Sequence, residues 1–477
     1  MTVELHDADP TQLAAALAAV STADRLETPL GSFELVDGVP TADSVDRLYD
    51  ALDFVRGVEV FLNAMPGASL VAMRRGFRSI GLEGNTTVGY TDPRGNSGSC
   101  FLTPNTATTY GSFFFDLRTS GPLVIEPPRQ SLCVVDDFWF RYVADMGIAG
   151  PDRGEGGRYL FLPPGYDGEE PEGFFTYRTP TFTNWVVLRA LGGVPSIKET
   201  RIYPLSHARD PEPTTFVNIA DLRFNTVHAN DGSFFDEIDE LVQEEPPGSL
   251  DPERAGQLAG IGIVHGRPFA PDERRRATLD TAARTAAAIS RALVYSPRDP
   301  EATIFPGSSW LQAFVGGSYE FLRDGARLLD ARAAFHYFAT VITPAMAHAQ
   351  VGAGSAYAYT AHDARGAILD GGRGYTLTLP PEPPAQNFWS VDVYDTQTRS
   401  LLQTDDPYPS VMNLGEGVDE GEDGAITIHF GPTAPPGRER NWIQTVPGKS
   451  WFPMLRLYGP LQPWFDGTWQ PSEIEPV

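Results

Sequence analysis

The segment DARAAFHYFAT places an acid, an arginine and a histidine on one predicted helix: Asp330, Arg332 and His336. Arg332 and His336 are four residues apart, so they share a helix face. An arginine beside a histidine favours the neutral imidazole, which can act as a general base while the guanidinium holds an anionic group. The alternative interpretation is a structural ion-pair network at a domain contact.

A second set of candidate residues lies in the segment VVDDFWFRYVADMG. Strand alternation through this segment puts Asp137, Trp139 and Arg141 on one face and two phenylalanines on the other. Asp137 is then the orienting carboxylate of the predicted site, and either Asp137 or Asp145 could be an acid–base carboxylate. The alternative is ordinary surface pairing of these charges.

The last quarter of the chain combines tryptophans with arginines. Such a set can line a pocket for an apolar ligand with one anionic end. More often it forms the core of a β-sandwich and a subunit interface, which is the favoured interpretation. The predicted substrate-binding residues are Asp330, Trp139, Trp389, Arg399 and Arg456.

The eight histidines include no pair at the three- or four-residue spacing of a helical zinc site. His228 is the best single candidate for a metal ligand, because Asp231 and Asp236 follow it closely and offer carboxylate oxygens. The alternative is an exposed loop histidine beside solvated carboxylates. These residue types identify no particular metal or other cofactor.

The elements that must position these residues change in character along the chain. Residues 1–80 form a predicted helical segment, and 81–225 consist of short apolar runs separated by Gly and Pro, which is typical of strands. Residues 226–350 have helical spacing and form a predicted bridge, and strand patterns return over 351–477. We therefore expect an α+β fold with two β-sandwich or jelly-roll-like domains, a helical bridge and N-terminal helices.

Apolar residues recur every three or four positions over residues 41–77, which predicts a long helix. Asp43 or Ser44 is the expected N-terminal cap of this helix. Pro66 is expected to break or kink it, because proline removes a backbone donor and clashes with the preceding turn.

The formal net charge is −26, with 62 acidic and 36 basic residues among 477. A field of this sign repels phosphate backbones and anionic lipids, so binding to nucleic acid or to a membrane surface is disfavoured. The two cysteines, Cys100 and Cys133, match no disulfide framework and are expected to be reduced thiols. No run of 18 apolar residues occurs, so the sequence predicts a soluble cytoplasmic protein.

Several segments together resemble bacterial proteins that join two domains of unknown function, numbers 1254 and 1214 in that series. In the first half the resemblance rests on TPNTATTYGSFFFDL, GPLVIEPP and DMGIAGPDRGEGGRYLFLPPGYDG. In the second half it rests on LDGGRGYTLTLP, QNFWSVDVYDTQTRSLLQTD and NWIQTVPGKSWFPMLRLYGPLQPWFDGTWQP. The resemblance extends from about Gly38 to the end of the chain.

This resemblance implies two β-sandwich-like domains in contact, often assembled as oligomers. Some members of the family have been associated with the breakdown of amphiphilic esters such as alkyl sulfates. Many members carry an acidic residue where this chain has Ala107. A role for that carboxylate elsewhere in the family therefore does not transfer to this chain.

Together with the predicted pocket residues, this resemblance implies a small-molecule enzyme, with hydrolysis as the favoured reaction. The expected substrate is amphiphilic or similar to a secondary metabolite and carries an anionic group. His336 is the predicted base, Arg332 the residue that holds the anion, and Asp137 the orienting carboxylate. A non-catalytic ligand-binding or scaffold protein and a metal-dependent lyase or oxidoreductase remain alternatives. The expected partners are the substrate and further copies of the chain in a homo-oligomer.

Overall fold

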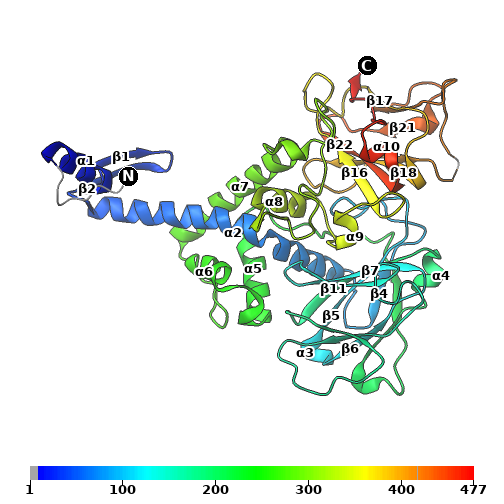
Figure 1. Ribbon diagram of the computed structural model, residues 1–477, viewed down its shortest axis with the longest axis horizontal. Helices are drawn as coiled ribbons and strands as arrows, with labels where there is room; N and C mark the ends of the chain where they lie inside the picture. Colours follow the sequence, from blue (N-terminus) through cyan, green and yellow to red (C-terminus); the bar gives the residue numbers. More distant parts are fainter. Residues whose placement is uncertain (1–8, 416) are drawn as a thin grey trace.

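The computed structural model describes residues 9–415 and 417–477. This part of the chain is a mixed α+β structure with several separate sheets and ten α-helices, and none of its sheets closes into a barrel. Figure 1 shows two β-rich regions at the right and helices that extend from them toward a narrow arm at the left. The predicted α+β class is therefore confirmed.

The narrow arm begins with a short helix and a small antiparallel sheet. Its elements are α1 (Pro10–Val20), β1 (Arg25–Thr28), β2 (Gly31–Val36) and β3 (Val39–Pro40). Asp9 caps α1 by accepting hydrogen bonds from the backbone N–H groups of Thr11 and Gln12. The sequence pattern does not predict the three strands, because they are short and mostly exposed.

Helix α2 (Ala42–Ser79) is the long helix that the sequence predicts. Thr41 caps it by accepting from the N–H of Ser44, so neither expected cap residue, Asp43 or Ser44, has that role. Pro66 lies inside the helix and does not end it, which corrects the predicted break. Pro66 lies in the run 64–74, where every side chain is buried, and this packing offsets the lost backbone hydrogen bond.

Helix α2 is the element against which the helical middle of the chain packs. The packed helices are α5 (Ser233–Glu244), α6 (Pro252–Gly260), α7 (Glu273–Tyr295) and α8 (Leu329–Phe338). Glycines in α2 allow close approach: a Cβ atom on Gly57 would lie 2.8 Å from the Cβ of Ala282, and one on Gly67 would lie 2.9 Å from Trp139.

Gly76 is the glycine of α2 with the closest neighbour, so Gly76→Ala is expected to lower the free energy of unfolding by about 1–3 kcal/mol. A Cβ atom there would lie 2.3 Å from the carbonyl oxygen of Asn225, which belongs to the backbone and cannot move alone. Urea unfolding at pH 7 measures the change. The control is Gly256→Ala in α6, where a Cβ meets nothing within 4 Å and alanine is expected to stabilise the helix. Equal effects in the two variants would contradict the prediction.

The N-terminal β-rich region contains a six-stranded and a four-stranded sheet. In spatial order the first is β13 (Thr215–Asn218), β4 (Thr87–Tyr90), β5 (Gly111–Asp116), β11 (Thr183–Ala190), β7 (Ser131–Asp137) and β8 (Tyr142–Gly147). The second is β10 (Phe175–Arg178), β9 (Tyr159–Leu162), β6 (Leu123–Glu126) and β12 (Arg201–Pro204). Short helices α3 (Leu117–Ser120) and α4 (Gly193–Ile197) follow two of the strands. One buried cluster contains Phe115 and Val186 from the large sheet and Ile125 and Phe161 from the small one.

The C-terminal β-rich region also contains two sheets. One is β16 (Ser355–Tyr359), β22 (Trp451–Pro460), β18 (Ala385–Asp395) and β19 (Ser410–Met412). The other is β21 (Trp442–Gln444), β20 (Ile426–Gly431), β17 (Tyr375–Leu379) and β23 (Glu475–Pro476). Val391 and Leu455 of the first sheet share a buried cluster with Leu377 and Ile428 of the second.

A single large core joins the helical middle to both β-rich regions. Its buried cluster contains side chains from α2, α5, α7, α8, the β7–β8 turn and the C-terminal strands β18 and β22. The small hairpin β14 (Leu322–Arg323) and β15 (Ala326–Arg327) precedes α8, while α9 (Pro344–Ala347) follows it and α10 (Gln462–Phe465) follows β22. Within the described residues, no helix is long and apolar enough to cross a bilayer.

Candidate functional site

A small pocket lies among α2, α6 and the turn between β7 and β8. Its polar lining is Asn63, Arg254 and Gln257, and its apolar lining includes Trp139 and Leu258. The open space is about 10 Å³, which is room for roughly one water-sized group. The pocket can therefore admit one small ion or a single polar group of a larger molecule.

Two arginines from different helices meet at Asn63 beside this pocket. Arg332 of α8 donates from Nη2 to Asn63 Oδ1 at 2.6 Å, and Arg254 of α6 donates from Nη2 to the Asn63 carbonyl oxygen at 3.1 Å. The Nε atoms of both arginines are buried without a hydrogen-bond partner in the described chain. Two guanidiniums therefore share one neutral partner and keep unused donors.

Neither arginine has an ion-pair partner among the described residues, and Asp251 and Asp137 attract Arg254 only from a greater distance. No carboxylate oxygen of the described residues lies within 4 Å of the guanidinium nitrogens of Arg332 or Arg254. Burial, together with repulsion from Arg254 and Arg327, lowers the pKa of Arg332 to about 9. Burial likewise lowers the pKa of Arg254, with Arg141 as an additional cause. Because Arg332 remains cationic at neutral pH, this cluster attracts an anion.

His336 is one turn further along α8, on the same buried face as Arg332. Burial lowers its pKa to about 3, and repulsion from Arg332 and Arg254 contributes, so the imidazole is neutral. Its Nδ1 atom has no hydrogen-bond partner in the described chain, and the ring packs against Phe140 and Phe335 at centroid distances of 5.2 and 5.1 Å. The predicted neutral histidine beside an arginine is present, although a base this weak is poorly matched to neutral pH.

The segment around Asp137 is a hairpin turn, which corrects the predicted strand alternation. Strand β7 ends at Asp137, β8 begins at Tyr142, and Phe140 between them has a left-handed φ of 58°. Asp137 accepts hydrogen bonds from the N–H groups of Trp139 and Arg141, both at 2.9 Å, and from Arg141 Nε at 2.7 Å. Its carboxylate thus holds the turn that carries Trp139 into the pocket.

The predicted substrate-binding residues do not form one site. Asp330 is exposed on α8, 3.5 Å from exposed Arg298, and only Trp139 lines the pocket. Trp389 is buried in the C-terminal core. Arg399 is buried against the ring of Tyr337, 4.1 Å from its centroid, and donates from Nε to the Tyr337 carbonyl. Arg399 and Arg456 both contact the backbone of Thr103, whereas the other three residues lie elsewhere in the fold.

Arg456 takes part in a separate buried network between the two β-rich regions. It lies on β22, 3.4 Å from Asp392 of β18, and donates from Nη2 to the carbonyl of Thr103 and to the hydroxyl of Tyr394. Asp392 accepts from the hydroxyl of Thr106 at 3.1 Å. The loop TPNTATTY therefore docks on the C-terminal sheet through this arginine and this carboxylate.

The predicted metal ligand His228 is not an exposed loop residue. It is 2% exposed, its Nδ1 lies 2.9 Å from the Ala229 carbonyl, and its ring packs against Phe61 and Phe234. Asp231 instead accepts from Ser233 at the start of α5, and Asp236 is exposed. Among residues 9–415 and 417–477, no three His, Cys, Asp or Glu side chains are grouped as a metal site.

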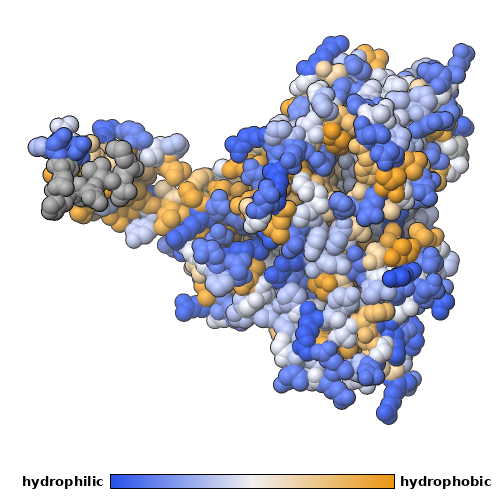
Figure 2. Space-filling view, in the orientation of Figure 1, coloured by the Kyte–Doolittle hydropathy of each residue, from blue (hydrophilic) through white to orange (hydrophobic). Residues whose placement is uncertain are grey.

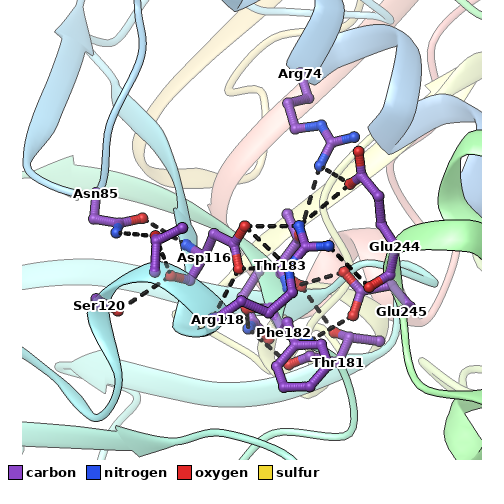
Figure 3. Close-up of polar contacts among 12 residues, drawn as sticks. Arg74, Asn85, Asp116, Arg118, Ser120, Thr181, Phe182, Thr183, Glu244 and Glu245 are labelled. Atoms are coloured by element: carbon purple, nitrogen blue, oxygen red, sulfur yellow. Dashed lines mark hydrogen bonds and ion pairs between the residues drawn. The ribbon is translucent and has the colours of Figure 1, made fainter.

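A third polar network, shown in Figure 3, illustrates how arginines are compensated elsewhere in this chain. Arg74 of α2 pairs with Glu240 at 2.7 Å and Glu244 at 2.6 Å. Arg118 donates to the Glu244 carbonyl, and Glu245 accepts from two backbone N–H groups at the start of β11. Every guanidinium here faces a carboxylate, so the network fastens α5 to the N-terminal sheet, in contrast to Arg254 and Arg332.

The fold and the pocket define an α+β protein with two β-rich regions and a small cationic pocket among its helices. Residues 85–202 match the family DUF1254, and residues 354–462 match the family DUF1214, each described as a protein of unknown function. The chain therefore joins a DUF1254 region to a DUF1214 region, in the order that the sequence resemblance predicts.

A solved structure shares the fold at low sequence identity. The VPA0106 protein from Vibrio parahaemolyticus is 16% identical with a TM-score of 0.53, over 89% of this chain and 99% of that one. An uncharacterized protein from Burkholderia cenocepacia is 13% identical over 89% and 94% of the two chains, and its TM-score of 0.37 supports no comparison. No curated protein matches the sequence.

Proposed function

We propose that this chain binds a small molecule through an anionic group held between Arg254 and Arg332. The observation that carries the proposal is the pair of uncompensated guanidiniums on Asn63, in a chain whose net charge is −26. The buried Arg332 and the partly buried Arg254 have no carboxylate within 4 Å, which raises the free energy of the folded state, and a bound anion lowers it. Arginine also provides the paired donors that carboxylate, phosphate and sulfate groups accept.

The pocket size and lining suggest how such a ligand is oriented. Room for one water-sized group means that one anionic oxygen enters, while the remainder of the molecule stays at the mouth. Val60, Trp139 and Leu258 supply an apolar lining beside the arginines. An anionic group attached to an apolar body fits this combination, in agreement with the amphiphilic ligand class that the family resemblance implies.

Hydrolysis of such a ligand is the second candidate function, and the free Nδ1 atom of neutral His336 favours it. In this scheme His336 would accept a proton from a water molecule and Arg332 would hold the anionic group. Because His336 is buried among phenylalanine rings, a water molecule must first reach its imidazole. Binding without turnover is therefore the leading proposal.

We also propose that each pair of sheets is a β-sandwich, because one buried cluster contains side chains from both sheets in each region. The cysteines Cys100 and Cys133 form no disulfide. These free thiols support a reducing, cytoplasmic location as a proposal.

Arg332→Gln and Arg254→Gln are each expected to weaken anion binding about 10–100-fold, because one charge-assisted hydrogen bond contributes about 1.5–3 kcal/mol. Isothermal titration with sulfate, phosphate, acetate and octanoate measures the affinity, and the anion bound best by the wild-type protein is then used for the variants. The matched control is Arg298→Gln, whose side chain is 88% exposed. It should bind like wild type.

Stability separates a binding role from a packing role. Without ligand, Arg332→Gln is expected to unfold at the same or a higher temperature than wild type, because it removes a buried cation that has no counter-ion. A large loss of stability, or equal binding by Arg332→Gln and Arg298→Gln, would contradict the proposal. Turnover of p-nitrophenyl acetate, phosphate or sulfate that disappears in His336→Asn would establish the hydrolase instead.

A further inference from the structure

Residues 9–56 form an arm that extends away from the body of the molecule (Figure 1). It consists of α1, β1–β3 and the first turns of α2, and α1 has no buried residue. Phe33 of β2 is buried, and the N–H of Glu34 donates to Ser44 in α2, so the small sheet is fixed to the start of the long helix. The arm is thus one packed unit that α2 joins to the body.

The arm carries a large share of the exposed apolar side chains of the chain. Figure 2 shows apolar surface along it. The exposed large apolar residues here are Leu13, Leu17, Val20, Leu30, Val36, Val39, Val45, Tyr49, Leu52 and Val55. Contiguous exposed apolar surface of this kind marks an interaction site.

The exposed apolar residues of α2 lie on the side of the helix that its own body leaves uncovered. On the covered side, Arg274 and Arg275 of α7 pair with Asp50 and Asp53 of α2, the latter at 3.0 Å. The uncovered side carries Val45, Tyr49, Leu52 and Val55 at helical spacing. These four residues form an apolar stripe, and the body orients α2 so that the stripe points outward.

The spacing of this stripe is nearly the same when read in either direction. Two copies of α2 laid antiparallel, with the twofold axis between Tyr49 and Leu52, bring Tyr49 opposite Leu52 and Val45 to within one residue of the position opposite Val55. Each apolar side chain then meets an apolar side chain of the other copy, as an interface between identical surfaces requires. We propose that the arm pairs antiparallel with the arm of a second copy of this chain and holds two bodies at opposite ends.

The charge of the arm disfavours anionic lipid surfaces and nucleic acids as occupants. Residues 9–56 contain nine Asp or Glu and three Arg. Anionic lipid surfaces and nucleic acids repel such a segment, and an amphipathic helix that binds membranes normally carries Lys and Arg around its apolar face. A second copy also carries this negative charge, so association should strengthen as salt screens the repulsion.

The expected result is a dimer of the 477-residue chain that dissociates when charged side chains replace apolar ones in the stripe. Light scattering after size-exclusion chromatography should give twice the chain mass for wild type and the single mass for Tyr49→Glu/Leu52→Glu. The matched control is Ile368→Glu, which places a charge at an apolar residue that is 65% exposed and outside the arm. It should remain dimeric. The dimer dissociation constant of wild type should decrease as the NaCl concentration is raised from 50 to 500 mM.

Disulfide trapping tests the antiparallel register. In a Cys100→Ser background, Val45→Cys mixed with Val55→Cys should form an intermolecular disulfide faster than either variant alone. A monomeric wild type, a dimer that survives the double glutamate change, or faster trapping within one variant than in the mixture would each overturn the proposal. So would a wild-type monomer that sediments with phosphatidylcholine–phosphatidylglycerol vesicles, since a membrane would then be the occupant.

Discussion

Asp392→Ala is expected to lower the free energy of unfolding by about 3–5 kcal/mol, because it leaves the buried guanidinium of Arg456 without its carboxylate. Asp392 is 0% exposed, and Arg456 Nε lies 3.4 Å from its Oδ2 atom. The carboxylate also accepts from the hydroxyl of Ser390 at 2.8 Å and from that of Thr106 at 3.1 Å. One substitution therefore removes the partner of a buried cation and of two hydroxyls.

The position of Asp392 enlarges the expected effect beyond one sheet. Thr106 belongs to the N-terminal region, and Arg456 donates to the carbonyl of Thr103 in the same loop. Burial raises the pKa of Asp392, while Arg456 and the hydroxyl donors oppose that rise. The pair thus depends on its complete set of hydrogen bonds, and losing Asp392 should loosen the contact between the two β-rich regions as well.

Urea unfolding followed by tryptophan fluorescence measures this loss, since Trp389 and Trp451 are buried in the C-terminal core. The matched control is Asp370→Ala, which removes one partner of an exposed ion pair with Arg373 and should cost at most about 1 kcal/mol. The double variant Asp392→Leu/Arg456→Met should recover part of the stability, because neither charge then remains. A loss in Asp392→Ala no larger than in the control would contradict the argument.

The sequence predicts elements well where the pattern is local. The apolar periodicity of α2 is strong over 38 residues, so its existence is predictable even though Pro66 suggests an end within it. Tertiary packing decides that point, because α5, α6, α7 and α8 all contact this helix. A single-residue rule about proline cannot include those contacts.

The β7–β8 turn shows a second limit of local patterns. Turns with a residue in the left-handed region usually contain Gly, Asn or Asp, whereas here Phe140 adopts that conformation. The pattern therefore resembles a continuous strand. Asp137 holds the turn through the N–H groups of Trp139 and Arg141, and this arrangement becomes visible only in three dimensions.

The candidate site was predictable only in part, for a reason of sequence distance. Arg332 and His336 are one turn apart on a helix, so local spacing identifies them. Arg254 and Asn63 are 191 residues apart and Arg332 and Asn63 are 269 apart, and no periodicity connects such positions. Asp137, the carboxylate predicted to orient the base, already accepts hydrogen bonds from Trp139 and Arg141 within its own turn. The excess of unpaired arginine charge appears only after folding.

Glu237 should make the folded protein less stable as the pH rises from about 5 to 8, by about 3 kcal/mol. Burial raises its pKa from 4.5 to about 8, with Glu240 and Asp231 adding to the rise and the Ala229 N–H and Arg75 opposing it. The folded state thus keeps a proton that the unfolded state releases above its own pKa. This contribution to stability is fully present at pH below about 4.5 and is lost as the pH approaches 8.

Glu237→Gln removes the titrating group while retaining a side chain of similar size in α5, so its free energy of unfolding should lose this dependence on pH. Urea unfolding at pH 5, 6, 7 and 8 gives the difference between wild type and variant, which should change by about 3 kcal/mol across the series. Asp236→Asn, exposed on the same helix, changes the charge equally and should keep the wild-type profile. Parallel profiles for wild type and Glu237→Gln would show that this carboxyl ionises in the folded protein as it does in the unfolded chain, with Arg75 at 3.8 Å compensating its burial.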